Sequence, residues 1–584
     1  MVEKFSHDIA IVGAGAAGLR AAIAAATFSD KLSIGLLSKV YPMRSHTVSA
    51  EGGTAAVLKD YDSTDLHALD TIKGSDYLAD QDAVELFVRE APSEVIQLEH
   101  WGCPWSREED GKLAARAFGG MSVKRTLFAA DKTGFHLLHT LLQHSLKYPG
   151  IVRYDEWFVL SLAVEDGAVR GLVALDLRTS ELAFVSASAV IVATGGAGRM
   201  YQFTTNGVIK TGDGMAISYR AGVPLKDMEF IQFHPTALPG TGILITEASR
   251  GEGGYLKNKD GERFLSRYTP EKMELGPRDI LSRALVQEIR EGRGFEGPFG
   301  AYLLLDLRHL GEKVIDSKLP FVRELALNYA KIDPVKEPIP VRPAQHYTMG
   351  GIHTDVNGRT PLPGLYSCGE AACVTINGAN RLGSNSLSEC LVFGRRAGQD
   401  AASFALSRRE RDHNPGGDRS VSSVQYVSLA EEKMNRLLKK EGGQERLAEM
   451  REGLQSLMET KVGIFREEKG LREALREIRE LKGRLPSAKV DDRGRTFNME
   501  MVHAFELDFM LDVAESVAYS ALMRQESRGA HFRTDFPKRD DKSLEGPDKG
   551  QEVPPGTDTR ELLPGVRSKV PSEDVRLGCT QLRE

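Results

Sequence analysis

Eight polar residues stand out because they lie in glycine-rich or polar segments and not on apolar helical stripes. They are His46, His234, Thr246, Glu247, Arg250, Arg278, His346 and Arg381. Any one of them alone is more simply explained as a surface or structural residue. Together they offer the charged, forked donors that replace the hydration shell of a carboxylate. The set therefore suggests a site for a small dicarboxylate, provided that the fold brings its members together.

A dinucleotide-binding signature stands at the start of the chain. An apolar strand over residues 8–12 runs into Gly13-Ala14-Gly15-Ala16-Ala17-Gly18 and then into an Ala-rich helix. The glycines permit a tight turn beside a pyrophosphate, and the helix N-terminus offers unpaired N–H groups and a positive dipole end. The next strand ends at Leu37-Ser38-Lys39, where NAD-binding folds often carry Asp or Glu. The signature predicts a nucleotide site and weakens an NAD assignment.

Two further strands end in glycine-rich turns far along the chain, at Ala193-Thr194-Gly195 and at Gly369-Glu370. Three such strand ends predict one α/β nucleotide domain that an insertion interrupts between about residues 236 and 345. Later, apolar residues fall at helical spacing over 447–458, 471–481 and 502–517, which predicts three amphipathic helices, most simply a bundle. From residue 534 the chain is rich in Pro, Gly and charge, which predicts an extended tail.

The overall composition is that of an ordinary globular protein, and at 584 residues the chain should form about two to four domains. The net charge of −6 gives no general attraction to nucleic acid or anionic lipid. No apolar run reaches the ~18 residues of a membrane span, and no signal peptide is evident, so membrane association should come through a partner. Five scattered cysteines without a CxxC pair argue against a metal cage, an iron–sulfur cluster or a disulfide framework, and indicate a reduced, cytoplasmic protein.

From about residue 5 to about residue 541, the chain resembles the flavoprotein subunit of the fumarate reductase and succinate dehydrogenase complexes. The motifs that carry the resemblance follow one another in the family's order. They are Arg44-Ser45-His46-Thr47, Ala50-Glu51-Gly52-Gly53, Phe118-Gly119-Gly120-Met121, Ala130-Asp131-Lys132-Thr133-Gly134, Thr211-Gly212-Asp213-Gly214, His234-Pro235-Thr236, Arg250-Gly251-Glu252-Gly253-Gly254, His346-Tyr347-Thr348-Met349-Gly350-Gly351, Asn380-Arg381-Leu382-Gly383, Glu526-Ser527-Arg528-Gly529-Ala530-His531 and Arg539-Asp540-Asp541.

The resemblance implies that the nucleotide is FAD and that it is held covalently. His46 matches the histidine that bonds to the flavin 8α-methyl group, a link that raises the flavin potential toward that of fumarate/succinate. The implied FAD-binding positions are Gly13, Ala14, Gly15, Ala16, Ala17, Gly18, Leu37, Ser38, Lys39, Ser45, His46, Thr47, Ala50, Glu51, Gly52, Gly53, Ala193, Thr194, Gly195, Asp213, Glu370, Arg381, Ser386 and Leu387.

The resemblance also assigns roles to the polar set. His234 and Thr246 match one carboxylate site and His346 and Arg381 the other, while Gly52 and Phe118 complete the substrate-binding positions. Arg278 matches the proton donor, and Glu247 and Arg250 match a relay that returns its proton. An arginine acid is unusual because its free pKa is above ~12, so the relay must replace the proton at once. Many relatives have Cys where this chain has Ser249, and thiol reagents should therefore inhibit it poorly.

Among family members, residues 333–343 and Ala50-Glu51-Gly52-Gly53 look more like the bacterial quinol:fumarate reductases. Succinate dehydrogenase is the alternative, since both enzymes use the same site. L-aspartate oxidase is a further relative, but it lacks the Arg-Ser-His-Thr arrangement and a covalent flavin. The resemblance implies exchange of electrons with an iron–sulfur subunit, quinone-carrying membrane anchors beyond it, and a peripheral position on the cytoplasmic face of the membrane.

The expected layout is α/β with a Rossmann-like FAD-binding domain, an α+β capping domain and a helical domain. It comprises residues 1–235 and 346–415 for FAD binding, 236–345 for the cap, 416–533 for the helical domain and 534–584 for the tail. A non-catalytic FAD-bound scaffold or an RNA-modifying flavoprotein is the alternative from another class. The net acidity and the full set of dicarboxylate-type residues speak against both, and no nucleic-acid partner is expected.

Overall fold

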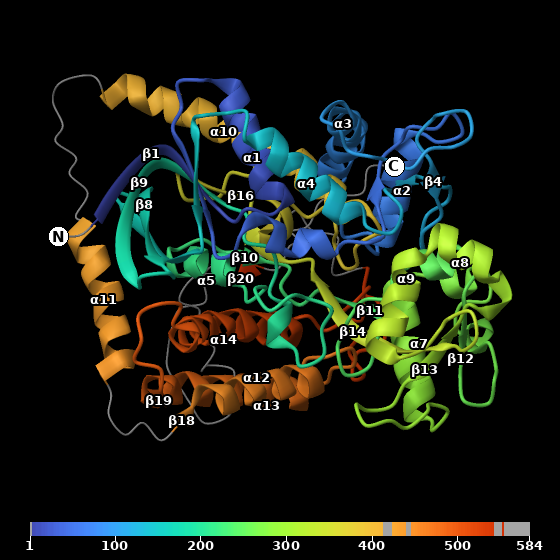
Figure 1. The fold of residues 1–584 in the computed structure, drawn as a ribbon. Coiled ribbons are helices and arrows are strands. Elements are labelled where there is room, and N and C mark those ends of the chain that lie inside the picture. The colour runs from blue at the N-terminus through green and yellow to red at the C-terminus, as the bar shows by residue number, and fades with distance from the viewer. Residues whose placement is uncertain (1–2, 413–422, 440–444, 542–551, 554–584) are drawn as a thin grey trace.

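The computed structural model describes residues 3–412, 423–439, 445–541 and 552–553. Its central sheet has the strand order β6-β2-β1-β9-β8-β7, and β16 also pairs with β9 (Figure 1). The strands are β1 (Glu3–Val12), β2 (Ile34–Ser38), β6 (Ile151–Asp155), β7 (Trp157–Glu165), β8 (Ala168–Asp176), β9 (Glu181–Val192) and β16 (Leu365–Ser367). The pairs β6–β2, β2–β1, β1–β9 and β9–β16 are parallel, whereas β7, β8 and β9 form an antiparallel meander.

The three strands that end in glycine-rich turns are neighbours in this sheet, as the sequence predicts. Val12 of β1 is in register with Val192 of β9, and Ser367 of β16 lies opposite the same residue. Because the strands are parallel, their carboxyl ends meet at one edge, which is where open α/β sheets bind ligands. Segments more than 170 residues apart in sequence therefore form one nucleotide-binding edge.

Helices cover both faces of the sheet (Figure 1). One side carries α1 (Ala16–Phe28), α2 (Thr64–Gly74), α3 (Gln81–His100), α4 (Thr133–Ser145) and α10 (Asn385–Asp412). The other side carries α5 (Asp213–Arg220), α11 (Ser423–Lys439), α12 (Leu447–Lys461), α13 (Glu468–Arg484) and α14 (Met499–Met523). No helix in the described ranges is long and apolar enough to cross a membrane.

The three late helices match α12, α13 and α14, which pack on one another, but α14 is more extensively buried than the single stripe of an amphipathic helix predicts. Helix α14 is buried over most of its surface, with Val502, Phe505 and Val513 at most 2% exposed and polar Ser520 at 0%. Between its ends, a narrow line that includes Asp508, Asp512 and Glu515 is only half-buried. The helix lies between the sheet and the pair α12–α13 (Figure 1). One continuous apolar cluster joins the three helices to β7, β8 and β9, so together they also form a layer on the sheet.

A second sheet belongs to the region expected as the insertion. It has the order β11-β14-β13-β12, from β11 (Ile231–Ala237), β12 (Tyr255–Lys257), β13 (Leu303–Asp306) and β14 (Ile339–Thr348), all antiparallel. Its helices are α6 (Ala248–Gly251), α7 (Arg278–Arg290), α8 (Glu312–Lys318) and α9 (Pro320–Leu325), and it has an apolar core of its own. The predicted limits at 236 and 345 fall inside β11 and β14.

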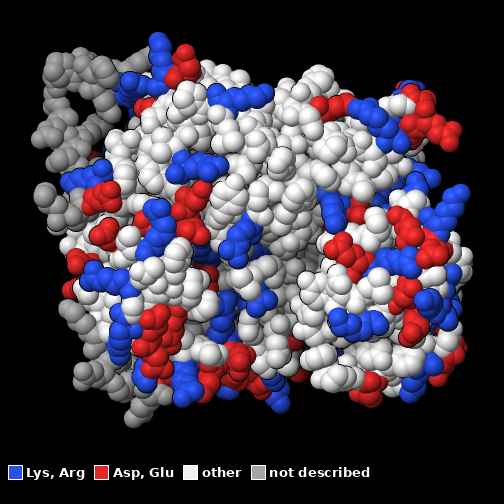
Figure 2. Space-filling view, in the orientation of Figure 1, with Lys and Arg blue, Asp and Glu red and all other residues white. Residues whose placement is uncertain are grey.

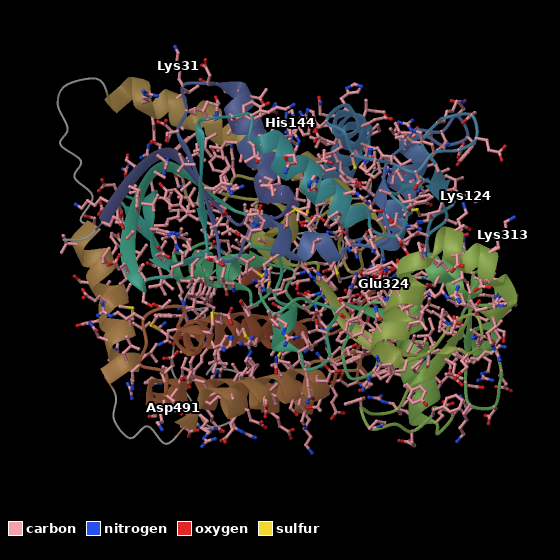
Figure 3. The ribbon with its side chains drawn as sticks, in the orientation of Figure 1. Lys31, Lys124, His144, Lys313, Glu324 and Asp491 are labelled. Atoms are coloured by element: carbon pink, nitrogen blue, oxygen red, sulfur yellow. The ribbon has the colours of Figure 1, made fainter. Side chains whose placement is uncertain are left out.

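Helix α9 packs this region against the segment that leads into α4, at Asp131 and Lys132. The Phe321 N–H donates to Asp131 Oδ2 at 2.6 Å, and the Lys132 ammonium lies 4.4 Å from the Phe321 ring. Glu324, labelled in Figure 3, forms an exposed ion pair with Lys132 at 3.3 Å. On the face in Figure 2, acidic and basic side chains are interspersed over both this region and the helical layer.

Short strands complete the described structure: β3 (Thr54–Ala55), β4 (Ala115–Arg116), β5 (Thr126–Leu127), β10 (Leu225–Lys226), β15 (Gly351–His353), β17 (Ala372–Cys373), β18 (Glu445–Arg446), β19 (Ala488–Lys489) and β20 (Glu552–Val553). The four cysteines within the described residues are free thiols, and Cys579 lies outside them. Most of the predicted tail, residues 542–551 and 554–584, also lies outside the described residues.

Candidate active site

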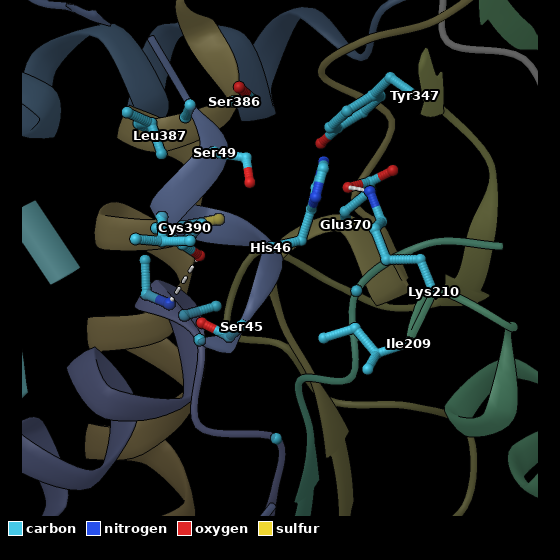
Figure 4. Close-up of a pocket in the computed structure, with 18 of the residues that line it drawn as sticks. Ser45, His46, Ser49, Ile209, Lys210, Tyr347, Glu370, Ser386, Leu387 and Cys390 are labelled. Carbon is cyan, nitrogen blue, oxygen red and sulfur yellow. Dashed lines mark hydrogen bonds and ion pairs between the residues drawn. The ribbon is translucent and has the colours of Figure 1, made fainter. Parts of the chain in front are cut away.

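A cavity of about 720 Å³ opens at the carboxyl edge of the central sheet and extends to the second sheet (Figure 4). It brings nearly all of the predicted site residues together. Those that line it are Gly13, Ala14, Gly15, Ala16, Ala17, Leu37, Ser38, Lys39, Ser45, His46, Thr47, Ala50, Glu51, Gly52, Gly53, Phe118, Ala193, Thr194, Gly195, Asp213, His234, Thr246, Glu247, Arg278, His346, Glu370, Arg381, Ser386 and Leu387.

Two predicted residues, Gly18 and Arg250, are absent from the cavity wall. Gly18 instead packs the first helix against the first turn, since a Cβ there would lie 1.8 Å from the Gly13 carbonyl oxygen. That is the role of the third glycine in the dinucleotide fingerprint. Arg250 is buried behind Glu247, with its Nη2 3.7 Å from Glu247 Oε2.

The phosphate end of the cavity fits a dinucleotide. Helix α1 begins at Ala16 directly after the glycine turn, so its N-terminal N–H groups and its dipole face the space. The hydroxyls of Ser45 and Thr194 are buried beside it without a hydrogen-bond partner. Buried polar atoms of this kind normally have a partner, and a polar ligand in the cavity would provide one.

Lys39 lies where the second strand leaves the sheet, and it is held by two carboxylates. Its Nζ lies 2.6 Å from Asp213 Oδ2 and 2.8 Å from Glu506 Oε1. Although burial alone would lower it, the pKa of Lys39 is raised because Asp213 and Glu506 face the ammonium. Glu506 belongs to α14, and sequence reasoning missed it because the spacing of residues does not show which distant helix packs there.

His46 starts a short 3-10 helix, residues His46–Ser49, and its ring projects into the cavity (Figure 4). Its Nδ1 accepts a hydrogen bond from the Gly207 N–H at 3.3 Å, so Nε2 is the nitrogen available for a further bond. Burial and the nearby Lys210 ammonium hold the pKa of His46 well below its usual range. The imidazole is therefore neutral at physiological pH, with its proton on Nε2, and Nε2 would have to release this proton to form a bond to carbon.

Lys210 is a second cation in the cavity wall that sequence reasoning missed. It forms a buried ion pair with Glu370, drawn as a dashed line in Figure 4. The Glu370 Oε1 also accepts the backbone N–H of Thr348 at 3.2 Å. Burial lowers the pKa of Lys210, and the pair with Glu370 opposes that shift. Lys210 thereby brings its positive charge close to His46 in a buried part of the cavity wall.

At the other end of the cavity, two histidines from two neighbouring strands of the second sheet, β11 and β14, face each other. The rings of His234 on β11 and His346 on β14 have centroids 5.0 Å apart. Strand β11 shifts register against β14 on both sides of His234, and such bulges re-aim side chains next to active sites. Burial and the surrounding arginines, chiefly Arg278 for His234, hold the pKa values of both histidines well below their usual range.

Both histidines are thus neutral hydrogen-bonding groups. The Nδ1 of His234 lies 3.2 Å from both the backbone nitrogen and the carbonyl oxygen of Thr236, so Nε2 is the ring nitrogen left for a ligand. The Nδ1 of His346 lies 2.8 Å from the Thr205 hydroxyl. Beside them the guanidinium of Arg381 lies 4.4 Å from the centre of the Tyr347 ring. Burial and the nearby Arg278 lower the pKa of Arg381 to about 10.

Arg278 is the first residue of α7 and forms a buried pair with Glu247. Its Nη2 lies 2.8 Å from Glu247 Oε2, and its side chain is 8% exposed, toward the cavity. Burial alone would raise the pKa of Glu247, but Arg278 and Arg250 hold it below its ordinary value. Three charged groups therefore lead from the cavity into the interior: Arg278 of α7, Glu247 at the start of α6, and Arg250 within α6.

Gln232 joins the two arginines, and sequence reasoning missed it. Its Oε1 accepts Nη1 of Arg278 at 3.0 Å and Nη2 of Arg381 at 3.1 Å. Its Nε2 donates to Asn380 Oδ1 and to the Arg381 carbonyl oxygen, both at 2.8 Å. The proximity of Gln232 to His234 in the sequence is the only signal that could have pointed to it.

Between the two ends, Gly52 and Phe118 form a neutral wall. A Cβ on Gly52 would lie 2.7 Å from the tip of the Phe118 ring, so the two are tightly packed. The neighbouring Glu51 is 5% exposed, and its Oε2 has no partner. Burial and the nearby Asp131 raise the pKa of Glu51 well above its usual range, which favours the protonated carboxylic acid.

The sheet edge fits a dinucleotide, and it joins a pocket of neutral histidines and arginines that fits an acid. This combination is typical of a flavin-dependent oxidoreductase, and comparison with known families assigns the chain to that class. Residues 8–387 match an FAD binding domain, and residues 451–545 match the fumarate reductase flavoprotein C-terminal domain.

The similarity to individual proteins is also extensive. The chain is 58% identical over 546 residues to the fumarate reductase flavoprotein subunit of Mycobacterium tuberculosis strain H37Rv, covering 92% of this chain and 93% of that protein. It is 44% identical over 559 residues to the succinate dehydrogenase flavoprotein subunit of Coxiella burnetii, covering 92% of each. A solved structure of an E. coli quinol fumarate reductase variant matches with 49% identity and a TM-score of 0.90 over 94% of each chain.

The chain therefore belongs to the fumarate reductase/succinate dehydrogenase flavoprotein family of FAD-dependent oxidoreductases, and its fold is the mixed α/β FAD-binding fold of that family.

Proposed function

We propose that this chain is the flavoprotein subunit of a quinol:fumarate reductase and interconverts fumarate and succinate. The observation that carries the proposal is the cavity in which Arg278, paired with Glu247, faces the same space as His346 and Arg381. The alternative, a succinate dehydrogenase flavoprotein subunit, would use the same residues. The higher identity to the fumarate reductase of M. tuberculosis than to the C. burnetii dehydrogenase favours the reductase.

The cavity would hold FAD, and we propose that FAD is attached covalently through Nε2 of His46, which would lose its proton. When bound, the flavin supplies the hydride donor and acceptor for the reaction. Within this chain the glycine turn and the α1 N-terminus would hold the phosphates. Lys39 and Asp213 would contact the nucleotide end, and the Lys210–Glu370 pair would lie on the flavin side.

The two carboxylates of the substrate would be held at opposite ends of the polar pocket. His234, through its Nε2, and Thr246 would take one, and His346 and Arg381 the other. Neutral histidines donate hydrogen bonds without adding charge, and Arg381 supplies the forked cation that a carboxylate prefers. The wall of Gly52 and Phe118 would fix the plane of the molecule. Such clamping orients the substrate and stabilises charge that develops on its oxygens.

Arg278 would give a proton to the substrate carbon that does not receive the hydride, and take it back in the reverse direction. A guanidinium can serve as an acid only if its proton is replaced at once, since its free pKa is above ~12. Glu247 contacts Arg278 directly and Arg250 stands behind Glu247, so the line of three groups would return the proton from the interior.

We further propose that the chain exchanges electrons with an iron–sulfur subunit seated on quinone-carrying membrane anchors, at the cytoplasmic face of the membrane. The support is the likeness to a flavoprotein from a quinol fumarate reductase. The division into FAD-binding, capping, helical and tail regions belongs to the same proposal.

The test is a comparison of fumarate reduction and succinate oxidation by the purified complex, each with low-potential and high-potential quinones. Faster fumarate reduction with the low-potential quinone is expected. Faster succinate oxidation with the high-potential quinone would favour the dehydrogenase, and turnover of neither acid would refute both.

A further inference from the structure

We propose that the segment after α14, residues 524–541, positions Arg381 and the helix that carries Arg278 relative to each other. This segment is called the C-terminal clasp below. The inference rests on the proposed function, because it concerns the geometry of the same dicarboxylate site. It makes Gly529 and Arg283 positioning residues, although neither lines the cavity.

The clasp is anchored by a buried arginine. The side chain of Arg528 is 0% exposed and its Nε lies 3.0 Å from Glu526 Oε1. Its Nη1 donates to the carbonyl oxygen of Asp76 at 3.0 Å, and the Asp76 carboxylate accepts the Gly529 N–H at 2.8 Å. Asp76 lies just after α2, so the clasp is tied to the FAD-binding part of the chain across more than 450 residues of sequence.

At Gly529 and Ala530 the clasp rests on the backbone that leads into Arg381. The Ala530 N–H donates to the Ala379 carbonyl oxygen at 2.9 Å. Gly529 has a φ of +52°, and a Cβ there would lie 2.5 Å from that same oxygen. Only glycine fits, both because its φ is positive and because the neighbouring backbone is so close. Ala379 is two residues before Arg381, so a displacement of the Ala379 backbone would also displace Arg381.

The contact between Ala530 and Ala379 also supports the side chain of Arg381. Ala530 and Ala379 belong to a small apolar cluster that includes Tyr347. The Tyr347 ring is the surface over which the Arg381 guanidinium lies, 4.4 Å from the ring centre. The clasp therefore sets both the backbone position of Arg381 and the position of the Tyr347 ring against which its guanidinium lies.

The carbonyl oxygen of Gly529 contacts α7, the helix that carries Arg278. This oxygen accepts a hydrogen bond from Nη1 of Arg283 at 2.6 Å, and the Arg283 guanidinium also lies 5.4 Å from the Phe532 ring. Arg283 is on α7, the helix whose first residue is Arg278. Gly529 thus contacts both the loop of Arg381 and the helix of Arg278, and it fixes their spacing independently of Gln232.

The test is Gly529→Ala in the full FAD-loaded chain, with Gly483→Ala as the matched control. A Cβ at Gly483, on α13, would meet nothing within 4 Å. Gly529→Ala should raise the KM for fumarate and the dissociation constant of the unreactive dicarboxylate malonate by about 10-fold or more, because displacements near 1 Å are that costly in such sites. Flavin content per chain should equal that of the control. Unchanged KM and malonate affinity would overturn the inference.

Arg283→Met keeps the inference testable if Gly529→Ala does not fold. It should weaken malonate binding or lower kcat by about 3-fold or more, because it removes the Arg283 hydrogen bonds to the Gly529 carbonyl oxygen and to Asp279. Arg283→Lys should lose less, since an ammonium can still donate to these acceptors. Values equal to the unaltered chain for both Arg283 variants would also overturn it. If the unaltered chain does not reduce fumarate, the proposed function fails, whereas the malonate titration still tests the clasp.

Discussion

Arg278 and Glu247 meet through a single carboxylate oxygen. Both Nε and Nη2 of Arg278 lie 2.8 Å from Oε2 of Glu247, while Oε1 accepts the Gly119 N–H at 2.6 Å. The guanidinium is therefore fixed in direction and backed by a carboxylate that remains ionised. This relationship gives an arginine the two properties of a proton donor, a defined aim toward the cavity and a neighbour that can restore its proton.

Replacing Arg278 with Met should abolish most turnover while leaving the substrate bound. We expect kcat for fumarate reduction to fall by about 10²–10⁴-fold, the usual contribution of a positioned acid. Arg278→Lys should retain more activity than Met, because an ammonium can still donate. Stopped-flow rates and malonate titrations on the same preparations give the two quantities, and a Met variant with near-normal kcat would remove Arg278 from the mechanism.

Gln232→Leu should disturb both arginines at once. The substitution leaves Nη1 of Arg278 and Nη2 of Arg381 without their shared acceptor. Losing hydrogen bonds to charged groups costs about 1.5–3 kcal/mol each, so kcat/KM should fall by at least about 10-fold. Gln232→Glu retains an acceptor oxygen and is the matched variant. Equal kcat/KM for the Leu variant and the unaltered chain would show that Gln232 has no positioning role.

His46→Ser should break the proposed covalent link without emptying the cavity. The variant is expected to bind FAD but to show no flavin fluorescence in a denaturing gel band, unlike the unaltered chain. Because the histidyl link raises the flavin potential, succinate oxidation should fall more than fumarate reduction. A fluorescent band in the Ser variant, or none in the unaltered chain, would contradict attachment at His46.

Glu389 should make stability depend on pH. It is buried, its Oε2 accepts the Tyr347 hydroxyl at 2.8 Å and the Asn377 amide at 3.0 Å, and burial raises its pKa to about 7. Between the unfolded pKa of about 4.5 and the folded value, the native state keeps a proton that the unfolded chain releases. Stability from this group is therefore full below pH ~4.5 and is lost as pH rises through 7, by about 3 kcal/mol in total.

The matched variant for this prediction is Glu389→Gln, which cannot titrate. Denaturant unfolding from pH 5 to 8 should show a smaller decline in the free energy of unfolding for Gln than for the unaltered chain. Parallel curves for the two proteins would mean that Glu389 does not titrate in this range.

Much of the fold and the site could be predicted from the sequence because both rest on local signals. The glycine turns mark the ends of β1, β9 and β16, and the family motifs identify residues such as His46 and Arg381. Residues that act through a partner leave no such signal. Gln232, Lys210 and Glu506 became apparent only once their partners, far away in sequence, were seen beside them.

The prediction for α14 is limited in a similar way, because residue spacing does not show how much of a helix is covered. Its apolar residues at helical spacing predict one buried stripe, yet the small and polar residues between them, such as Ala514 and Ser516, are buried as well. A stripe shows that one face packs against something. Whether the opposite face is also covered depends on the sheet and helices that meet there, which spacing alone does not encode.

The most direct test of the account is the reaction of the reduced full chain with fumarate, followed by flavin absorbance in stopped flow. The account predicts rapid reoxidation with succinate formed in proportion to the flavin oxidised, and a much slower reaction for Arg278→Met at the same fumarate occupancy. Reoxidation that yields no succinate, or that proceeds equally fast in the Met variant, would contradict it.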